Sequence, residues 1–162
     1  MARRDDLRRV GQCLTRIARI GHGRDAARYR SERSGVLLSR PAMAILACLR
    51  TGGPMRLSDL ARQADLEAPL VSREIRGLVE GGYVRRDPDP TDGRAGIVML
   101  TASGRRASEA YRAATDDIIA ETFAGWSSAD LRVLAGLLER VAEDFTRPVA
   151  ERKALRARAQ AQ

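Results

Sequence analysis

Residues 57–104 read LSDLARQADLEAPLVSREIRGLVEGGYVRRDPDPTDGRAGIVMLTASG, and this stretch decides the fold. Its first half predicts two short helices joined by a short connection. Ser58 is placed to cap the first helix, and Pro69 fits the first turn of the second. The Gly81-Gly82 pair ends the second helix. Two short helices joined this closely predict a helix-turn-helix.

The second helix separates apolar from polar side chains. Residues at helical spacing predict a buried face made of Val71, Ile75, Leu78 and Val79. The outward positions are occupied by Leu70, Ser72, Arg73 and Arg76. A second helix with polar and cationic residues on its outer face is typical of a helix-turn-helix.

A β-hairpin is expected directly after these helices. Residues 83–86 predict one strand, and residues 95–100 predict the returning strand. Residues 87–94 between them are rich in Asp and Pro and contain the turn dipeptide Asp92-Gly93. A hairpin in this position is a wing, so the stretch as a whole predicts a winged helix.

Amphipathic helices are predicted on both sides of this core. Before it, residues 7–20 carry one apolar stripe that includes Leu7, Val10, Leu14 and Ile17, and Ser39 with Pro41 starts another helix. After it, residues 102–123 predict a helix with a stripe of mostly small residues, and Ser127 with Asp130 is close to a capping box. The last helix repeats apolar residues at a three-four spacing typical of a helix–helix seam: Leu131, Leu134, Leu138, Val141 and Phe145.

We therefore expect a mainly α chain with a small β-wing (α+β). The expected regions are N-terminal helices over 1–38, a winged helix-turn-helix over 39–104 with its wing at 83–100, C-terminal helices over 105–147, and a basic, frayed tail over 148–162. The seam spacing alone does not distinguish packing within one chain from packing between two.

The 162-residue chain carries a formal net charge of +8, which favours a polyanionic partner such as nucleic acid. The excess is N-terminal. Residues 1–53 hold 12 arginines against 4 acidic residues, whereas residues 54–106 hold 9 against 8. Net charge therefore does not single out the helix-turn-helix as the nucleic-acid site, and the position of individual arginines must do so.

Composition argues against several other classes of protein. No apolar run approaches a membrane span, and the N-terminus lacks the apolar stretch of a secretory signal, so we expect a cytoplasmic protein without a membrane partner. Two cysteines, Cys13 and Cys48, and one histidine, His22, are too few for a disulfide framework, a structural zinc site or a catalytic triad. We expect no catalytic residue, no metal and no cofactor.

Residues 57–104 resemble the winged-helix core of the MarR family of bacterial transcriptional regulators. The most specific match is the wing, with Arg86-Asp87-Pro88-Asp89, then Asp92-Gly93-Arg94, then Leu100-Thr101 and Gly104. The resemblance implies a homodimer that binds a pseudo-palindromic operator in double-stranded DNA. It also implies a repressor that a small, often aromatic, ligand releases.

The resemblance assigns roles to residues at matching positions. It implies DNA contacts by Ser58, Pro69, Leu70, Ser72, Arg73, Arg76 and, at the wing tip, Arg94, with Asp92 supporting that arginine. Dimerisation is implied for Leu7, Val10 and Leu14 of the first helix and for the seam of the last. Two positions depart from the family pattern, because Gly77 and Gly93 stand where the family often has basic residues, which predicts fewer contacts to DNA.

Three alternatives remain open from the sequence. The chain can be a winged-helix dimer that binds proteins and not DNA. It can also be a thiol-based redox regulator that uses Cys13, although the neighbouring apolar residues favour a buried Cys13. An enzyme is the least favoured. The ligand-binding residues are unknown, because helix packing and not periodicity determines which residues line a cavity.

Overall fold

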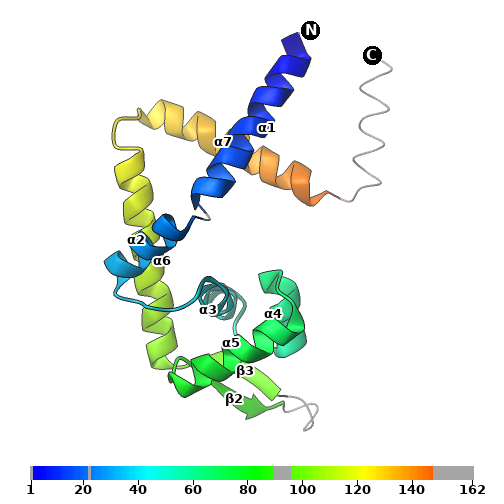
Figure 1. Cartoon of the computed structure of the whole chain (residues 1–162), viewed down its shortest axis with the longest axis vertical. Helices are drawn as coiled ribbons and strands as arrows, with labels where there is room; N and C mark the ends of the chain where they lie inside the picture. The colour runs from blue at the N-terminus through cyan, green and yellow to red at the C-terminus, as the bar shows by residue number, and fades with distance from the viewer. Residues whose placement is uncertain (1, 22, 90–95, 148–162) are drawn as a thin grey trace. The chain divides into compact units, whose positions relative to one another are not determined.

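The computed structural model describes residues 2–21, 23–89 and 96–147. In chain order the elements are α1 (Ala2–Gly21), α2 (Arg24–Ser34), α3 (Arg40–Gly52), β1 (Met55–Arg56), α4 (Leu57–Ala64), α5 (Ala68–Glu80), β2 (Val84–Pro88), β3 (Gly96–Leu100), α6 (Ala102–Thr122) and α7 (Ser128–Thr146) (Figure 1). The chain forms two compact units, Met1–Ile119 and Ala120–Gln162. Helices dominate and the strands are few, as the α+β prediction requires.

Two of the predicted helix starts are confirmed by their caps. Ser39 accepts a hydrogen bond from the backbone N–H of Ala42 at 3.1 Å. Ser127 accepts one from the N–H of Asp130, also at 3.1 Å, and donates its hydroxyl proton to the Asp130 carboxylate at 2.6 Å. Each side chain satisfies a donor of the first turn, which explains why α3 and α7 begin where they do.

One hydrophobic core connects α3, α4, α5 and the sheet. Its least exposed side chains are Ile45, Leu46, Leu60, Val71, Ile75, Leu78, Val84 and Val98. The inward face predicted for α5 is therefore confirmed, with one error. Val79 is 41% exposed, because it follows Leu78 directly and lies beside the buried stripe and not within it.

The three strands form an antiparallel sheet in the order β1-β3-β2. Val84 pairs with Leu100 and Arg85 with Met99, which confirms the predicted hairpin; its first strand begins one residue later and ends two residues later than predicted. Val84 and Val98 point into the core. Because side chains alternate along a strand, Arg85 and Met99 lie on the outer face of the sheet. The turn at residues 90–95 lies outside the described residues.

The base of the hairpin is joined tightly to α6. Thr101 donates its hydroxyl proton to the carbonyl of Gly82 at 2.7 Å, and its oxygen accepts from the N–H of Gly104 at 3.1 Å. A Cβ atom on Gly104 would lie 2.0 Å from the backbone oxygen of Tyr83. Only glycine fits this approach, which gives a physical reason for the Thr101 and Gly104 pattern seen in the sequence.

Candidate nucleic-acid interface

Helix α5 has one exposed, mostly polar face and one fully buried apolar face. Val71, Ile75 and Leu78 are at most 1% exposed. Pro69, Ser72, Arg73 and Arg76 are exposed, and Leu70 is half-buried. The structure therefore confirms the four outward positions that the sequence predicted, and it also exposes Pro69. Their contact with DNA remains a prediction.

The two arginines of this face differ in their surroundings. Arg73 lies 3.6 Å from the carboxylate of Glu74, which also accepts the hydroxyl proton of Ser39 at 2.6 Å. Arg76 has no hydrogen bond or ion pair within the described part of the chain. Its guanidinium is thus available for a phosphate or a guanine edge.

A buried carboxylate at the end of β2 is a feature that the sequence analysis missed. The Asp89 side chain is 4% exposed and accepts a hydrogen bond from the Nε of Arg56 at 2.6 Å. This contact connects Asp89, which directly follows β2, to β1 on the opposite edge of the sheet. From the sequence, Asp89 was predicted to lie in the turn region and to match the family's wing, but not to be buried; a charged partner is the usual reason for burying an aspartate.

Several predicted site residues need correction or lie outside the described residues. Ser58 does not cap α4, because the helix begins at Leu57 and its N-cap is Arg56, which makes no side-chain cap bond. Strand β1 runs directly into the helix, so the cap position falls on a strand residue, and Ser58 lies exposed in the first turn. His22, Asp92, Gly93, Arg94 and the tail over 148–162 are outside the described ranges.

The apolar stripe of α1 is exposed in the single chain. Leu7, Val10, Ile17 and Ile20 are between 50% and 62% exposed, and Leu14 is half-buried. The prediction that Cys13 is buried is wrong, since Cys13 is exposed on the same helix, where nothing in the described chain covers that side. By contrast, burial raises the pKa of the Cys48 thiol, which disfavours its reactive thiolate form.

Helix α7 also leaves its seam uncovered within its own unit. Leu131 is 36% exposed, Leu138 47% and Phe145 65%, whereas Leu134 and Val141 are half-buried. Seven-residue spacing therefore produces the predicted apolar face. Among the described residues of this unit, 120–147, no covering partner for it is found.

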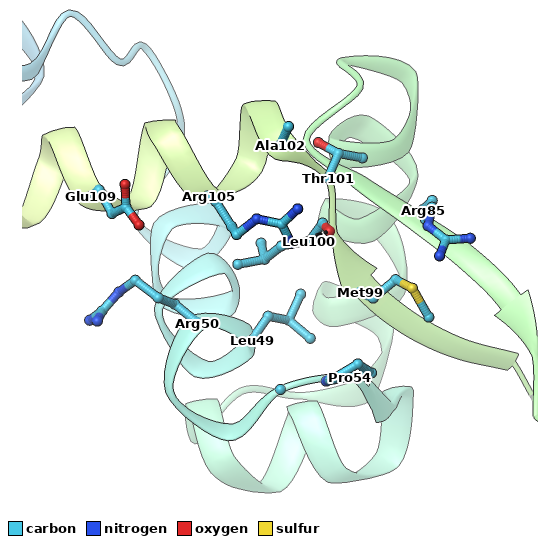
Figure 2. A pocket seen from close by; sticks show the side chains of 11 residues that line it. Leu49, Arg50, Pro54, Arg85, Met99, Leu100, Thr101, Ala102, Arg105 and Glu109 are labelled. Carbon is cyan, nitrogen blue, oxygen red and sulfur yellow. Dashed lines mark hydrogen bonds between the residues drawn. The ribbon is translucent and has the colours of Figure 1, made fainter.

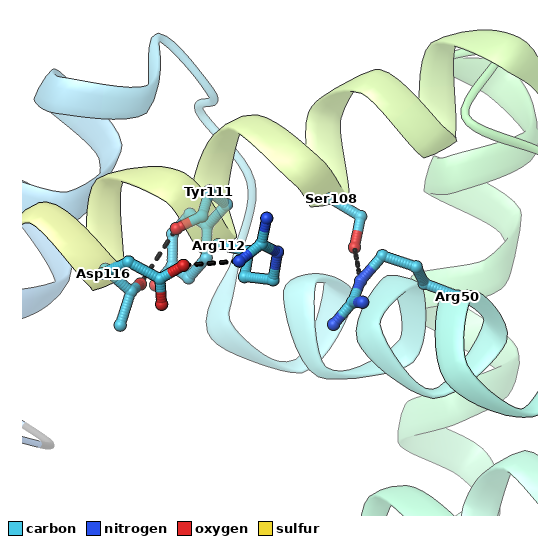
Figure 3. A network of polar contacts seen from close by, with 6 residues as sticks. Arg50, Ser108, Tyr111, Arg112 and Asp116 are labelled. Carbon is cyan, nitrogen blue, oxygen red and sulfur yellow. Dashed lines mark hydrogen bonds and ion pairs between the residues drawn. The ribbon is translucent and has the colours of Figure 1, made fainter.

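A cavity of about 340 Å³, here called the helix cavity, lies between α3 and α6. Its lining is mixed: Met43, Ala44 and Ala47 are apolar, and Arg40, Arg50, Ser108, Tyr111, Arg112, Thr115 and Asp116 are polar. Figure 3 shows two of its contacts, the hydrogen bond from Arg50 to Ser108 at 3.2 Å and the ion pair of Arg112 with Asp116. Arginine side chains beside small apolar ones suit a small organic anion.

The helix cavity is connected to the N-terminal helices through Tyr111. The Tyr111 hydroxyl accepts a hydrogen bond from the Nε of Arg30 on α2 at 3.1 Å. Another nitrogen of Arg30 donates to the carbonyl of Gly21, the last residue of α1, at 2.9 Å. One side chain therefore links the cavity wall to the junction of α1 and α2.

Other kinds of site are not found in the described ranges. Among residues 2–21, 23–89 and 96–147, no three His, Cys, Asp or Glu side chains lie close enough to hold a metal ion. Within the same ranges, no helix has both the length and the apolar character that a membrane crossing needs.

Known proteins share this sequence pattern. The MarR family profile matches residues 38–95. The helix-turn-helix transcriptional regulator Mb0904 of Mycobacterium bovis is 32% identical over 107 residues, which are 66% of this chain and 73% of the relative. The transcriptional repressor IacR of Pseudomonas putida is 25% identical over 137 residues, which are 85% of this chain and 81% of IacR.

Solved structures share the fold. The MarR family transcription regulator SP03579 superposes with a TM-score of 0.76 at 21% identity, covering 89% of this chain and 93% of that one. BpsR of Bordetella bronchiseptica superposes with a TM-score of 0.58 at 23% identity, covering 83% and 98%. The BpsR structure concerns regulation of its DNA binding by 6-hydroxynicotinic acid.

A helix-turn-helix followed by a hairpin, with arginines exposed on its second helix, defines the class of winged-helix DNA-binding proteins. The sequence matches narrow this class further. The chain belongs to the MarR family of transcriptional regulators, whose members bind DNA and are not enzymes.

Proposed function

We propose that the chain is a homodimeric, sequence-specific DNA-binding regulator. Residues 39–104 bind DNA, and residues 1–38 and 105–147 form the dimer. The observation that carries this proposal is the outer face of α5, where Arg73 and Arg76 are exposed above a fully buried base. A helix held this firmly enters a major groove in one orientation, with its arginines at guanine edges or phosphates.

The remaining contacts follow from the family pattern. In the proposed complex, Pro69, Leu70 and Ser72 face the major groove beside the two arginines of α5, and Ser58 binds a phosphate. Arg94 enters the minor groove at the wing tip, and Asp92 supports it. The phosphate contact positions the protein, whereas the arginines of α5 supply most of the sequence preference.

The exposed apolar faces of α1 and α7 support the homodimer. On these two long helices, leucine, isoleucine and phenylalanine side chains are about half exposed. Exposing this much apolar surface to water is unfavourable in free energy for a single chain. A second copy that covers Leu7, Val10 and Leu14 together with the α7 seam removes this cost. The dimer then presents two recognition helices to half-sites about one turn of DNA apart.

A small aromatic acid is the proposed effector, and the helix cavity is its proposed site. The carboxylate is held by an arginine of the cavity rim, and the ring packs on Met43 and the alanines beside it. BpsR, whose studied ligand is an aromatic carboxylic acid, supports this choice. The repressor IacR supports a repressor role.

The hydrogen bond between Tyr111 and Arg30 is proposed to couple ligand binding to the release of DNA. A ligand that binds Tyr111 competes with the hydrogen bond to Arg30, which also holds the end of α1. The ligand thereby favours one arrangement of the dimer helices over another. When the two recognition helices are wrongly spaced, they no longer bind both half-sites together, and affinity falls steeply.

Fluorescence anisotropy on the intergenic DNA upstream of the chain's own coding sequence tests the proposal. We expect nanomolar binding with a clear preference over scrambled DNA, and at least a tenfold loss in Arg76→Ala. Arg28→Ala, which removes an exposed arginine of α2, is the matched control and should bind normally. The result that would favour the protein-interaction dimer is weak binding without preference. The upstream DNA and genomic fragments chosen by selection would then bind no better than scrambled DNA.

The ligand arm of the test uses 6-hydroxynicotinic acid and benzoate as probes. We expect either acid to release wild-type protein from DNA. Tyr111→Phe should still bind DNA but require more ligand. If neither acid binds in the helix cavity at millimolar concentration, the proposed effector class is wrong, although DNA binding stands.

Exposure of Cys13 favours a second candidate, regulation by a thiol. Arg9 and Arg16 lie one helical turn on either side of it, and cations favour the reactive thiolate. Treatment with hydrogen peroxide should then release wild-type protein from DNA but not Cys13→Ser. Equal behaviour of the two proteins would eliminate this candidate.

A further inference from the structure

A second cavity, here called the sheet cavity, lies at the end of the sheet where β2 begins and β3 ends. It has a volume of about 660 Å³, within the range of small-molecule sites. The end of α3, strands β2 and β3 and the first turns of α6 line it. None of the predicted DNA-binding or dimerisation residues lines it.

The lining combines an apolar floor with a cationic rim. Leu49, Pro54, Met99 and Leu100 supply the apolar surface, and Arg50, Arg85 and Arg105 supply three positive charges against the single carboxylate of Glu109. Figure 2 shows Arg85 at one end of the cavity, Arg50 and Glu109 at the other, and Arg105 between them.

Existing contacts hold the three guanidinium groups without using all their donors. Arg105 donates to the carbonyl of Leu100 at 3.2 Å, and Arg50 donates to the buried Ser108 at 3.2 Å. Arg85 is paired with Asp87. Each guanidinium carries five N–H donors, so further donors of each arginine remain for a ligand.

DNA is not the anion that this arrangement fits. Arg85 and Met99 face away from the core, whereas α5 packs on the core side of the sheet. They also pair near the end of the hairpin that is remote from its turn. The sheet cavity therefore opens on a surface that neither the recognition helix nor the wing tip occupies.

We propose that the sheet cavity binds an amphipathic organic anion, a carboxylate with a flat apolar body. The carboxylate binds between Arg105 and Arg85, where no lining acid competes. The apolar body lies on Met99 and Pro54. The site is separate from the helix cavity, although Arg50 lies at the edge of both.

Methyl resonances of methionine distinguish the two cavities. Met99 lines the sheet cavity, Met43 lines the helix cavity, and Met55 is a buried core residue that lines neither. Protein labelled with ¹³C at the methionine methyl groups is titrated with 2-naphthoate and with its neutral analogue 2-naphthamide. Single Met→Leu variants assign the signals.

We expect 2-naphthoate to shift the Met99 signal saturably, with the amide binding at least tenfold more weakly. Arg105→Gln and, independently, Arg85→Gln should weaken the Met99 titration at least fivefold and leave that of Met43 unchanged. Arg112→Gln, a helix-cavity variant, should leave the Met99 titration unchanged.

Three results would overturn the proposal. They are a Met99 signal that does not respond to 2-naphthoate, equal binding of acid and amide, and a Met99 shift caused by duplex DNA and not by the acid. The last result would assign the surface to DNA.

Discussion

The winged-helix core and the flanking helices contain the same types of apolar residue at helical spacing, but these residues are buried in the core and exposed on the flanking helices. In the core, Ile45, Leu46 and Leu60 are completely buried. On α1 and α7, Ile17 is 62% exposed and Phe145 65%. All of these residues recur at helical spacing, so periodicity predicts that an apolar face exists but not what covers it. The core is complete within one chain, whereas the flanking faces are left exposed, and the proposed dimer covers them.

The largest difference in stability between a buried and an exposed apolar residue is expected within α5 itself. Leu78 is 1% exposed, and the adjacent Val79 is 41% exposed. Leu78→Ala should lower the free energy of unfolding by about 2–5 kcal/mol, because it opens a cavity in the core. Val79→Ala should cost less than about 1 kcal/mol. Urea denaturation at a fixed protein concentration measures both, and equal losses would contradict the buried stripe described for α5.

A charge on the α7 seam should separate the subunits while the core stays folded. In Leu138→Glu, a charge replaces a side chain that the proposed dimer buries, and we expect the dimer dissociation constant to rise about 100-fold, which is about 2.7 kcal/mol. Analytical ultracentrifugation measures it. Arg140→Glu, off the seam, is the matched control. A Leu138→Glu protein that remains dimeric at nanomolar concentration would show that the seam does not form the interface.

Within the winged helix, the ion pair of Arg56 and Asp89 should affect DNA affinity although neither residue is expected to contact DNA. Arg56→Ala leaves a buried carboxylate without one of its partners and loosens the start of the wing. We expect about a tenfold loss of DNA affinity, with a smaller further loss in the double variant Arg56→Ala/Asp89→Asn. A double-mutant cycle in which the two losses simply add would show that the pair does not position the wing.

The smallest effect concerns Gly77, and it should be a gain. A Cβ atom at this position meets no atom within 4 Å, so larger residues fit. Gly77→Ala and Gly77→Arg should both stabilise α5 by up to about 1 kcal/mol. Only Gly77→Arg should raise DNA affinity, by a few-fold, because it adds a charge near the backbone. Equal DNA affinities of the two variants would place Gly77 away from the DNA.

Local features of the fold were predictable because local chemistry determines them. Ser39 and Ser127 cap the predicted helices, and the alternation around Val84 and Val98 produces the predicted hairpin. The error at Ser58 arose where a strand runs directly into a helix, so that the backbone and not the side chain sets the helix start.

Features that depend on tertiary contact were not predictable. The burial of Asp89 depends on Arg56, which is 33 residues away in the sequence. The helix cavity exists because Ser108 and Tyr111 of α6 meet α3, and no periodicity encodes that meeting. Cys13 is exposed because none of the described residues covers its side of α1, and a single sequence does not specify which element covers a helix.

The salt dependence of DNA binding tests most directly whether α5 binds DNA with its arginines. The measurement is the dissociation constant for operator DNA at several sodium chloride concentrations, for wild type and Arg76→Ala. We expect a straight line of log affinity against log salt with a slope of about −0.9 for each phosphate contact, and a slope reduced by about one in Arg76→Ala if that residue binds a phosphate. A salt-independent affinity, or the absence of any binding at low salt, would contradict the assignment of α5 as a DNA-binding helix.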